Sequence, residues 1–199
     1  MDRTTMEGDA QTVSLIDEEG RSLLCYVEQT IRAKGKEYVL LLPVDTPIEI
    51  FAWAEDDESD DELLMDIDEG ELEEVFSTAR AVLAEQDLML HHTALTLTAS
   101  GDLPEINEDD IISLDIEEGD DEPMNMEQFQ QLASFFHEEQ EYVVCTPLDP
   151  LLFFAQMTPS GQPELLSPED FQVLMALDEF QEVRAQLEQQ AELMDDELE

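Results

Sequence analysis

The chain has 199 residues, and its apolar fraction of 42% is close to that of ordinary globular proteins, so it can bury a core. Its 53 aspartates and glutamates stand against 7 lysines and arginines, a formal net charge of −46. That balance excludes the clustered cations with which proteins bind nucleic-acid phosphates or anionic membranes, and the length suits one large domain or two of about 100 residues.

The first half of the chain predicts several strands followed by one helix. Apolar runs separated by turns at DEEG, AKGK and PVDTP indicate strands at Thr12–Ile16, Ser22–Ile31, Glu37–Leu42, Ile48–Ala54 and Leu63–Ile67. The segment EDDESDDE before the last of these is expected to be a solvated loop. A helix is expected to start at Asp68, because Glu71 follows three residues later and apolar residues then recur at helical spacing through Leu83.

The second half predicts a similar series. A strand at Thr93–Thr98 and a turn-rich linker at Ser100–Asp110 precede ISLDIEEG, which indicates another strand. MEQFQQLASFFHEE has phenylalanines at near-helical spacing, but its place opposite the strand that ends at Ile31 favours a strand. TPSGQP predicts a hairpin turn, and Ser167 followed by Pro168 predicts a helix start. The buried stripe expected for this helix comprises Leu174, Leu177, Phe180, Val183 and Leu187.

The two halves contain similar short sequence motifs in the same order. EYVLLLPVD and EYVVCTPLD align at an offset of 104 residues, and the alignment drops one residue in the turn that follows. The repeated positions are Glu37, Tyr38, Pro43, Asp45 and Arg80 in the first copy and Glu141, Tyr142, Pro147, Asp149 and Arg184 in the second.

We therefore predict an internal duplication and an α+β fold of two tandem related units, each a small antiparallel sheet followed by one C-terminal helix. The expected divisions are a first unit at residues 1–92, a strand and linker at 93–110, and a diverged second unit with an acidic tail at 111–199.

The pattern DEEG…KGKEYVLLLPVD, followed by an acid-rich stretch and ELEEVF, resembles the YrzB-like family of small acidic bacterial proteins of unknown function. Two units with a diverged second copy are similar to the cyanobacterial and chloroplast branch of that group. The resemblance implies a small α+β domain in the cytosol or stroma and brings no catalytic residues. The second copy has Glu139 where the first has Gly35, and it lacks the acidic loop. A function of those features would therefore be confined to the first copy.

No metal or cofactor site is predicted. Zinc sites need Cys and His at short, defined spacings, whereas Cys25, Cys145, His91, His92 and His137 are scattered. The acidic glycines do not fit the sixth position of a calcium-binding EF-hand loop. The glycine and serine fingerprints of nucleotide-binding and hydrolase sites are also missing from the sequence. We therefore expect no cofactor and no enzymatic activity.

The repeat gives the cysteines a structural interpretation. Cys25 aligns with Phe129 and Cys145 aligns with Leu41, so each stands at a position that is apolar in the other copy. Both are therefore expected to be core residues.

The repeated acids and arginines have two readings each. Asp45 and Asp149 follow a repeated proline and are expected to shape the turn through hydrogen bonds to the backbone, although paired-carboxylate catalysis stays an alternative. Arg80 and Arg184 are expected to pair with Asp45 and Asp149, and the alternative is a surface arginine that packs its aliphatic stem.

The leading functional hypothesis is a non-enzymatic acidic interaction module, an adaptor, assembly factor or regulator, that engages a basic protein. The candidate interaction loop comprises Glu55, Asp56, Asp57, Glu58, Asp60, Asp61 and Glu62. Its acids either contact the partner or only keep the loop solvated. One alternative is a nucleic-acid mimic that occupies a basic groove, and another is an enzyme with an acidic site between the two units.

The expected location is the bacterial cytoplasm. MDRTTMEGDA has neither the apolar core of a signal peptide nor the basic amphipathic character of a transit peptide. Direct binding of nucleic acid or membrane is not expected, and the oligomeric state is left open.

Overall fold

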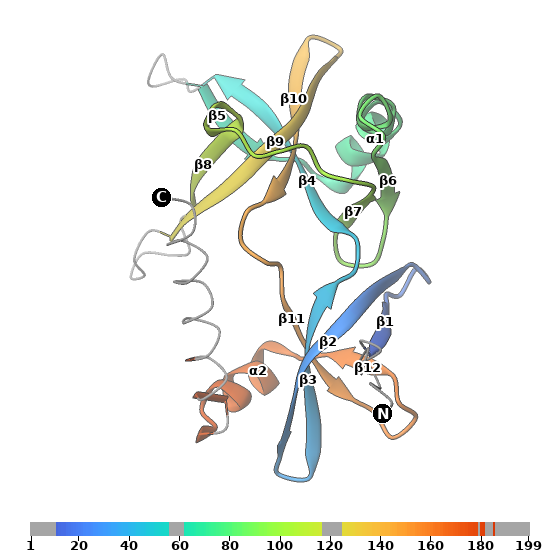
Figure 1. Ribbon diagram of the computed structural model, residues 1–199, viewed down its shortest axis with the longest axis vertical. Coiled ribbons are helices and arrows are strands. Elements are labelled where there is room, and N and C mark those ends of the chain that lie inside the picture. The colour runs from blue at the N-terminus through green and yellow to red at the C-terminus, as the bar shows by residue number, and fades with distance from the viewer. Residues whose placement is uncertain (1–10, 56–61, 117–124, 179, 182–184, 186–199) are drawn as a thin grey trace, which may run out of the picture. The chain divides into compact units, whose positions relative to one another are not determined.

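The computed structural model describes residues 11–55, 62–116, 125–178, 180–181 and 185, which form a mostly β protein (Figure 1). The strands before the linker are β1 (Thr12–Ile16), β2 (Ser22–Ala33), β3 (Lys36–Pro43), β4 (Thr46–Glu55), β5 (Glu62–Asp66), β6 (Met89–His92) and β7 (Leu97–Ser100). Those after it are β8 (Ile111–Ile116), β9 (Asn125–His137), β10 (Gln140–Pro147), β11 (Phe153–Met157) and β12 (Pro163–Leu165). The helices are α1 (Glu69–Ala84), α2 (Pro168–Met175) and a 3₁₀ turn, η1 (Glu108–Asp110).

The predicted α+β class is wrong. Strands dominate the described secondary structure, and they form two multi-stranded sheets instead of one sheet and one helix for each half of the sequence. Most strands and both helices lie close to where the sequence places them. The error lies in the pairing, because strands of one half pair with strands of the other.

The chain forms two compact units, and each draws on both halves of the sequence. The five-stranded unit holds most of β1 and β2 together with β3, β11, β12 and α2. The seven-stranded unit holds residues 16–23, strands β4 to β10 and α1. The division at residues 1–92, 93–110 and 111–199 stays a prediction about the sequence repeat, and the compact units cut across it.

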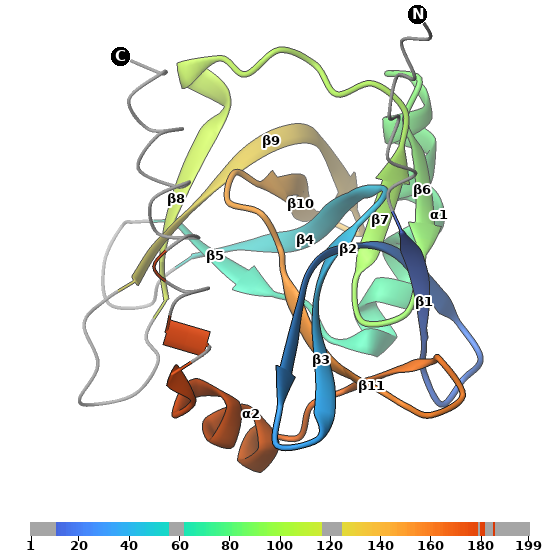
Figure 2. The same ribbon diagram turned by 60° about the horizontal axis from the view of Figure 1, so that its bottom comes forward.

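The five-stranded sheet has the order β1-β2-β3-β11-β12, and Figure 2 shows its strands β2 and β3 side by side. β3 runs antiparallel to β11, with Leu41 opposite Phe153 and Tyr38 opposite Gln156. β11 turns back into β12 through the segment that the sequence predicts as a hairpin turn, where the backbone N–H groups of Gly161 and Gln162 bond to Thr158. A buried cluster of this unit comprises Ile31, Ala33, Tyr38, Leu174 and Phe180.

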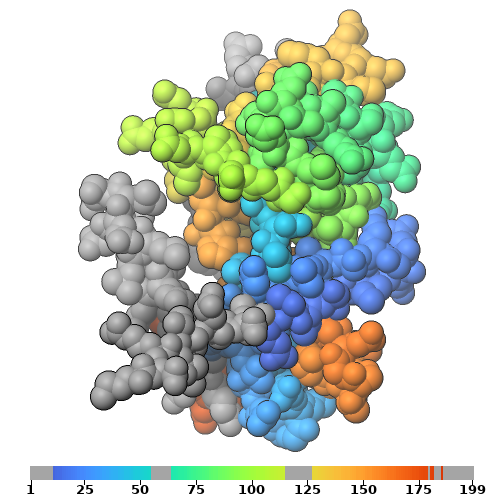
Figure 3. Space-filling view, turned by 45° about the vertical axis from the view of Figure 1, so that its right-hand side comes forward, coloured from blue at the N-terminus to red at the C-terminus, as the bar shows by residue number. Residues whose placement is uncertain are grey.

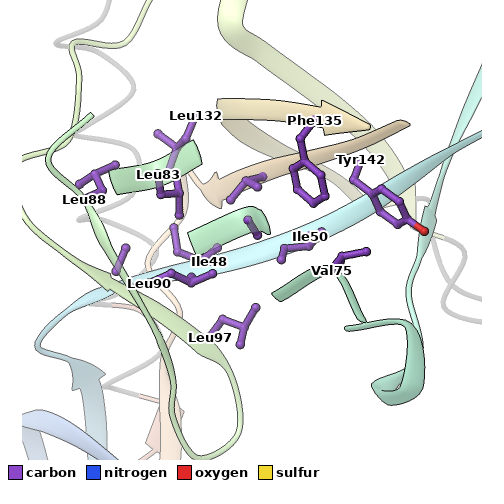
Figure 4. Packing of buried hydrophobic residues seen from close by; sticks show 13 residues of the cluster. Ile48, Ile50, Val75, Leu83, Leu88, Leu90, Leu97, Leu132, Phe135 and Tyr142 are labelled. Atoms are coloured by element: carbon purple, nitrogen blue, oxygen red, sulfur yellow. The ribbon is translucent and has the colours of Figure 1, made fainter. Parts of the chain in front are cut away.

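The seven-stranded sheet has the order β6-β7-β4-β10-β9-β8, and β5 pairs with β4 outside this path. Successive side chains of a strand point to opposite faces, so β4 contributes to two cores. On one face Ile48 and Ile50 belong to the cluster that packs against α1, with Ile50 beside Val75 (Figure 4). On the other face Phe51 packs edge-on against Phe129, with ring centroids 5.3 Å apart.

The larger core of this unit packs α1 against strands from both halves of the sequence (Figure 4). The rings of Phe135 and Tyr142 stack with centroids 5.4 Å apart. The Tyr142 hydroxyl donates to Glu71 at 2.7 Å, which ties β10 to the first turn of α1. The buried members of the cluster are Ile48, Ile50, Val75, Ala79, Leu83, Leu88, Leu90, Leu97, Ala99, Leu132, Phe135, Tyr142 and Val144.

The two ladders that join the halves share one register. In β3–β11, Tyr38 is opposite Gln156, and in β10–β4, Tyr142 is opposite Ala52. The other three pairs of each ladder follow the same rule, so every residue in one ladder lies 104 positions from its counterpart in the other. The offset of 104 therefore holds on both sides of the link between β3 and β4, whereas the sequence alignment introduces a one-residue gap there.

The predictions for several local elements are confirmed. β9 is a strand despite its near-helical phenylalanine spacing. Asp68 caps α1 by accepting from the backbone N–H of Glu71, and Ser167 caps α2 by accepting from that of Asp170. The strand expected at Thr93–Thr98 is shifted, because β7 begins at Leu97, and the sequence missed β6. Val183 and Leu187 of the predicted stripe lie outside the described residues.

Candidate functional site

The candidate site lies at a gap in the seven-stranded sheet. β10 pairs along one edge of β4. The opposite edge is shared by β7, which pairs with Thr46–Ile48, and β5, which pairs with Phe51–Glu55. Glu49 and Ile50 lie between these two partners. A strand edge without a neighbour leaves room beside the backbone, and a pocket opens at this point.

The pocket has a volume of about 420 Å³ and is formed by this unit alone. β4 and the end of β5 supply part of the wall, the first turn of α1 supplies another part, and the segment between β6 and β7 closes the side. Its apolar lining comprises Ile48, Ile50, Phe51, Ile67, Leu72, Leu95 and Leu97. Its polar lining comprises Arg21, Glu49, Asp66, Glu69, His92, Thr93 and Thr96.

Glu49 is the least compensated charge of the pocket. Its pKa is raised, first by burial and then by the nearby carboxylates Glu127 and Asp66. Within the described part of the chain, the Glu49 carboxylate accepts no hydrogen bond and forms no ion pair. Removing a carboxylate from water without a partner costs free energy. The site therefore holds a carboxylate whose charge a bound cation would stabilise.

Arg21 does not neutralise Glu49, because its guanidinium is engaged elsewhere. Its Nε donates to Asp17 at 2.7 Å, its Nη2 pairs with Glu19, and its Nη1 donates to Nε2 of His92 at 2.7 Å. An arginine can only donate, so His92 accepts with a neutral Nε2. Burial alone would raise the pKa of Asp17, but the bonds with Arg21 outweigh it and lower that pKa.

The His92 ring also lies on Phe76 of α1, with centroids 5.7 Å apart. The turn at residues 17–21 is thus fastened to β6 and α1, and it forms one fixed wall of the pocket.

The candidate interaction loop lies mainly outside the described residues. Its two ends belong to paired strands, because Glu55 of β4 is opposite Glu62 of β5. Residues 56–61, which contain most of its acids, therefore connect the two strands of a hairpin. Its proposed contacts with a partner stay a prediction.

The expected roles of Asp45 and Arg80 are wrong. Asp45 is half-buried and Asp149 is exposed, and neither accepts a hydrogen bond from any residue that the structure describes. Arg80 is exposed on α1 and forms no ion pair with a described carboxylate. Asp45 lies in the short link between β3 and β4, and its side chain forms no described hydrogen bond that would shape this link. Arg184 lies outside the described residues.

The other members of the repeat motif have structural positions. Tyr38 and Tyr142 are both 4% exposed. Burial, and then the hydrogen bond to Glu71, raise the pKa of Tyr142 to about 12. Pro43 and Pro147 end β3 and β10. Glu37 pairs with Arg32 at 2.8 Å, and Glu141 is half-buried beside the β9–β10 turn.

The prediction that both cysteines are core residues is confirmed. Cys25 and Cys145 are both buried, with no exposed surface. Burial raises the pKa of Cys25 to about 11, and burial together with Glu49 raises that of Cys145 to about 12. A thiol held protonated is a poor nucleophile and metal ligand.

Sequence reasoning missed the pocket. One signal was present, since Glu49 is a single carboxylate inside the apolar run IEIFAW. The other polar lining residues come from separate elements, and their meeting depends on the gap between β5 and β7. In the part of the chain that the structure describes, no group of three or more His, Cys, Asp or Glu could hold a metal ion. Across the same residues, no helix has the length and apolarity to cross a membrane.

Comparison with protein-family models gives two matches. Residues 18–84 match the model described as a protein of unknown function, DUF1292, and residues 87–195 match the one described as a protein of unknown function, DUF3727. The comparisons with curated proteins and with solved structures found no significant match.

Proposed function

Since the chain belongs to the DUF3727 family, which carries no assigned activity, we propose from its own site that it is a non-enzymatic interaction module for a basic protein. The observation that carries this proposal is Glu49, a partly buried carboxylate without a described cation, in a pocket with apolar walls. A lysine or arginine side chain of the partner is the group that fits this arrangement.

The pocket offers the two kinds of contact that a long basic side chain requires. Lysine and arginine bury their aliphatic stems against apolar surface and keep the charged head in a polar place. Phe51, which lies on the same face of β4 as Glu49, supplies apolar lining, and Glu49 and Asp66 supply carboxylates. A cation seated there would relieve the repulsion between Glu49 and Asp66. Binding would therefore be favoured by charge and by burial together.

The rest of the chain favours the same class of partner. Of the 7 basic residues, Arg21 and Arg32 are already paired with carboxylates of this chain. The net charge of −46 leaves a strong negative field around the molecule. Such a field speeds the approach of a basic surface and repels nucleic acid. The acids of residues 56–61 add to this negative charge.

We propose further that the two halves are related copies and that the first belongs with the YrzB-like proteins. The shared offset of 104 positions in the two ladders supports the first point. The match of residues 18–84 to the DUF1292 model is consistent with the second. A cytoplasmic location is proposed on the sequence features given above.

The pocket can be tested with a synthetic peptide that carries one lysine between leucines, labelled with a fluorophore. The variant Glu49→Gln removes the central carboxylate, and the control Glu73→Gln removes an exposed carboxylate of α1 outside the pocket. Both variants change the net charge equally. Loss of a charged hydrogen bond costs about 1.5–3 kcal/mol, so E49Q should weaken binding roughly 10- to 100-fold and E73Q less than twofold. Equal effects of the two variants would reject the pocket.

The loop can be tested separately in the full chain. Replacing the acids of residues 56–61 by Asn and Gln keeps the length of the hairpin connection and removes its charge. If the loop contacts the partner, affinity capture of basic proteins at low salt should weaken in this variant and be lost at high salt in both forms. An unchanged set of captured proteins would assign the loop to solvation.

A further inference from the structure

The described core clusters each combine residues from both halves of the chain. The cluster against α1 combines residues before the linker, such as Val75, with residues after it, such as Val144. The cluster on the other face joins Phe51 to Phe129. The cluster of the five-stranded unit joins Tyr38 to Leu174. Each half therefore completes its burial only against the other half.

Strand ladders and side-chain hydrogen bonds join the halves as well. β3 pairs with β11, and β4 pairs with β10. Tyr142 donates to Glu71 at 2.7 Å, and the Gln86 side chain donates to the Leu132 carbonyl at 2.6 Å. These contacts depend on the sequences of the two halves. They do not depend on whether the halves belong to one chain.

The linker between the halves is lightly held. Residues 101–109 are all exposed, and Figure 3 shows yellow-green surface of this region on one face of the molecule. Leu103 and Ile106 are 40% and 53% exposed, so they add little burial. The described hydrogen bond that ties this segment to the sheet runs from the Gln130 side chain to the Pro104 carbonyl at 3.1 Å. Opening the linker would therefore break few contacts.

We propose that a second copy of this chain is a partner, through reciprocal exchange of halves about a hinge at residues 101–110. Residues 1–100 of one chain pair with residues 111–199 of the other, and every contact between halves forms again between chains. Exchange of identical elements is a low-cost route to a dimer, because it requires no new interface. This inference is independent of the proposed binding of a basic protein.

The balance between closed monomer and exchanged dimer follows from the linker and the charge. A short flexible linker keeps the halves of one chain at an effective concentration on the order of millimolar, so the monomer is favoured in dilute solution. Two chains of net charge −46 repel each other, and salt screens that repulsion. The dimer fraction should therefore rise with salt, whereas binding of a basic protein should fall.

A shortened linker would force the exchange. β8 lies four strand positions from β7 in the sheet order, and neighbouring strands are about 4.8 Å apart, so the linker spans roughly 19 Å. Deletion of residues 103–110 leaves Gly101 and Asp102, which reach about 11 Å when fully extended. One chain can then no longer close its own sheet. The matched control replaces residues 103–110 by a Gly-Ser segment of equal length.

The first measurement is size-exclusion chromatography with light scattering on both variants. The deletion variant should elute as a dimer with a β-type circular dichroism spectrum, and the Gly-Ser control as a monomer. A folded, monomeric deletion variant would overturn the proposal.

The second measurement uses the full-length linker, so it does not depend on the deletion variant folding. Two differently tagged wild-type chains are unfolded together in guanidinium and refolded at high protein concentration in 1 M salt. Sequential purification on both tags should recover a mixed dimer that is rarer at low salt. Recovery of monomer alone after such refolding would equally overturn the exchange.

Discussion

The β9–β10 hairpin turns through Glu138 and Glu139, whose φ angles are +53° and +88°. The β2–β3 hairpin turns 104 positions earlier through Lys34 and Gly35, at +50° and +74°. Positive φ at both central residues defines a type I′ turn, in which glycine is favoured at the second position. Glutamate in this region is strained by about 1–2 kcal/mol, and glycine costs about 0.5–1 kcal/mol in chain entropy. Glu139→Gly should therefore stabilise the protein by about 0.5–1 kcal/mol.

Urea unfolding followed by circular dichroism measures the change, with Glu139→Gln as the control. Both variants remove one negative charge, but only glycine relieves the backbone. The reverse change, Gly35→Gln, should destabilise by a similar amount. A Cβ at Gly35 would meet no atom within 4 Å, so its cost comes from the backbone alone. If E139G gains no more stability than E139Q, the strain argument is refuted.

Three further outcomes are expected. Asp68→Ala and Ser167→Ala each remove a helix N-cap bond and should cost about 1 kcal/mol in urea unfolding; losses below about 0.3 kcal/mol would contradict the capping role. The folded chain holds the proton of Glu49 more tightly than the unfolded chain, so the wild-type protein loses stability as the pH rises through the folded pKa of Glu49. The stability of Glu49→Gln relative to wild type should therefore increase between pH 4 and 7. A stability difference that is equal at every pH would contradict this. Cleavage at a protease site inserted after Leu103 should leave both fragments in one particle on size-exclusion chromatography, whereas separation without denaturant would refute the shared cores.

Local structure was predictable because it depends on neighbours in sequence. Asp68 with Glu71, and Ser167 with Pro168, mark helix starts whose cap bonds the structure contains. The sequence also suggested that the second hairpin differs from the first because Glu139 replaces Gly35. The positive φ angles show that the turn type is kept and that Glu139 tolerates the strained conformation.

The pocket was not predictable because its residues meet only through pairing between distant elements. Glu49 could be noticed as a carboxylate within an apolar strand. Its neighbours Asp66 and Glu127 belong to β5 and β9, and their effect on the pKa of Glu49 depends on the order of strands in the sheet. Charge patterning pointed instead to the acidic loop, which is prominent in sequence whatever its surroundings.

The exchange of strands between the halves has a physical reason in the short link between β3 and β4. Only Val44 and Asp45 separate these strands, and a two-residue hairpin there would need positive φ at both. A β-branched valine strongly disfavours that conformation, and neither Val44 nor Asp45 adopts it. The second link contains Asp149 before Pro150, and a residue before proline is restricted to extended backbone. Both links therefore carry the chain onward instead of back, so β3 and β10 each pair with a strand from the other half. The repeated motifs that suggested two self-contained units thus contain the residues that prevent β3 and β10 from pairing with the next strand of their own half.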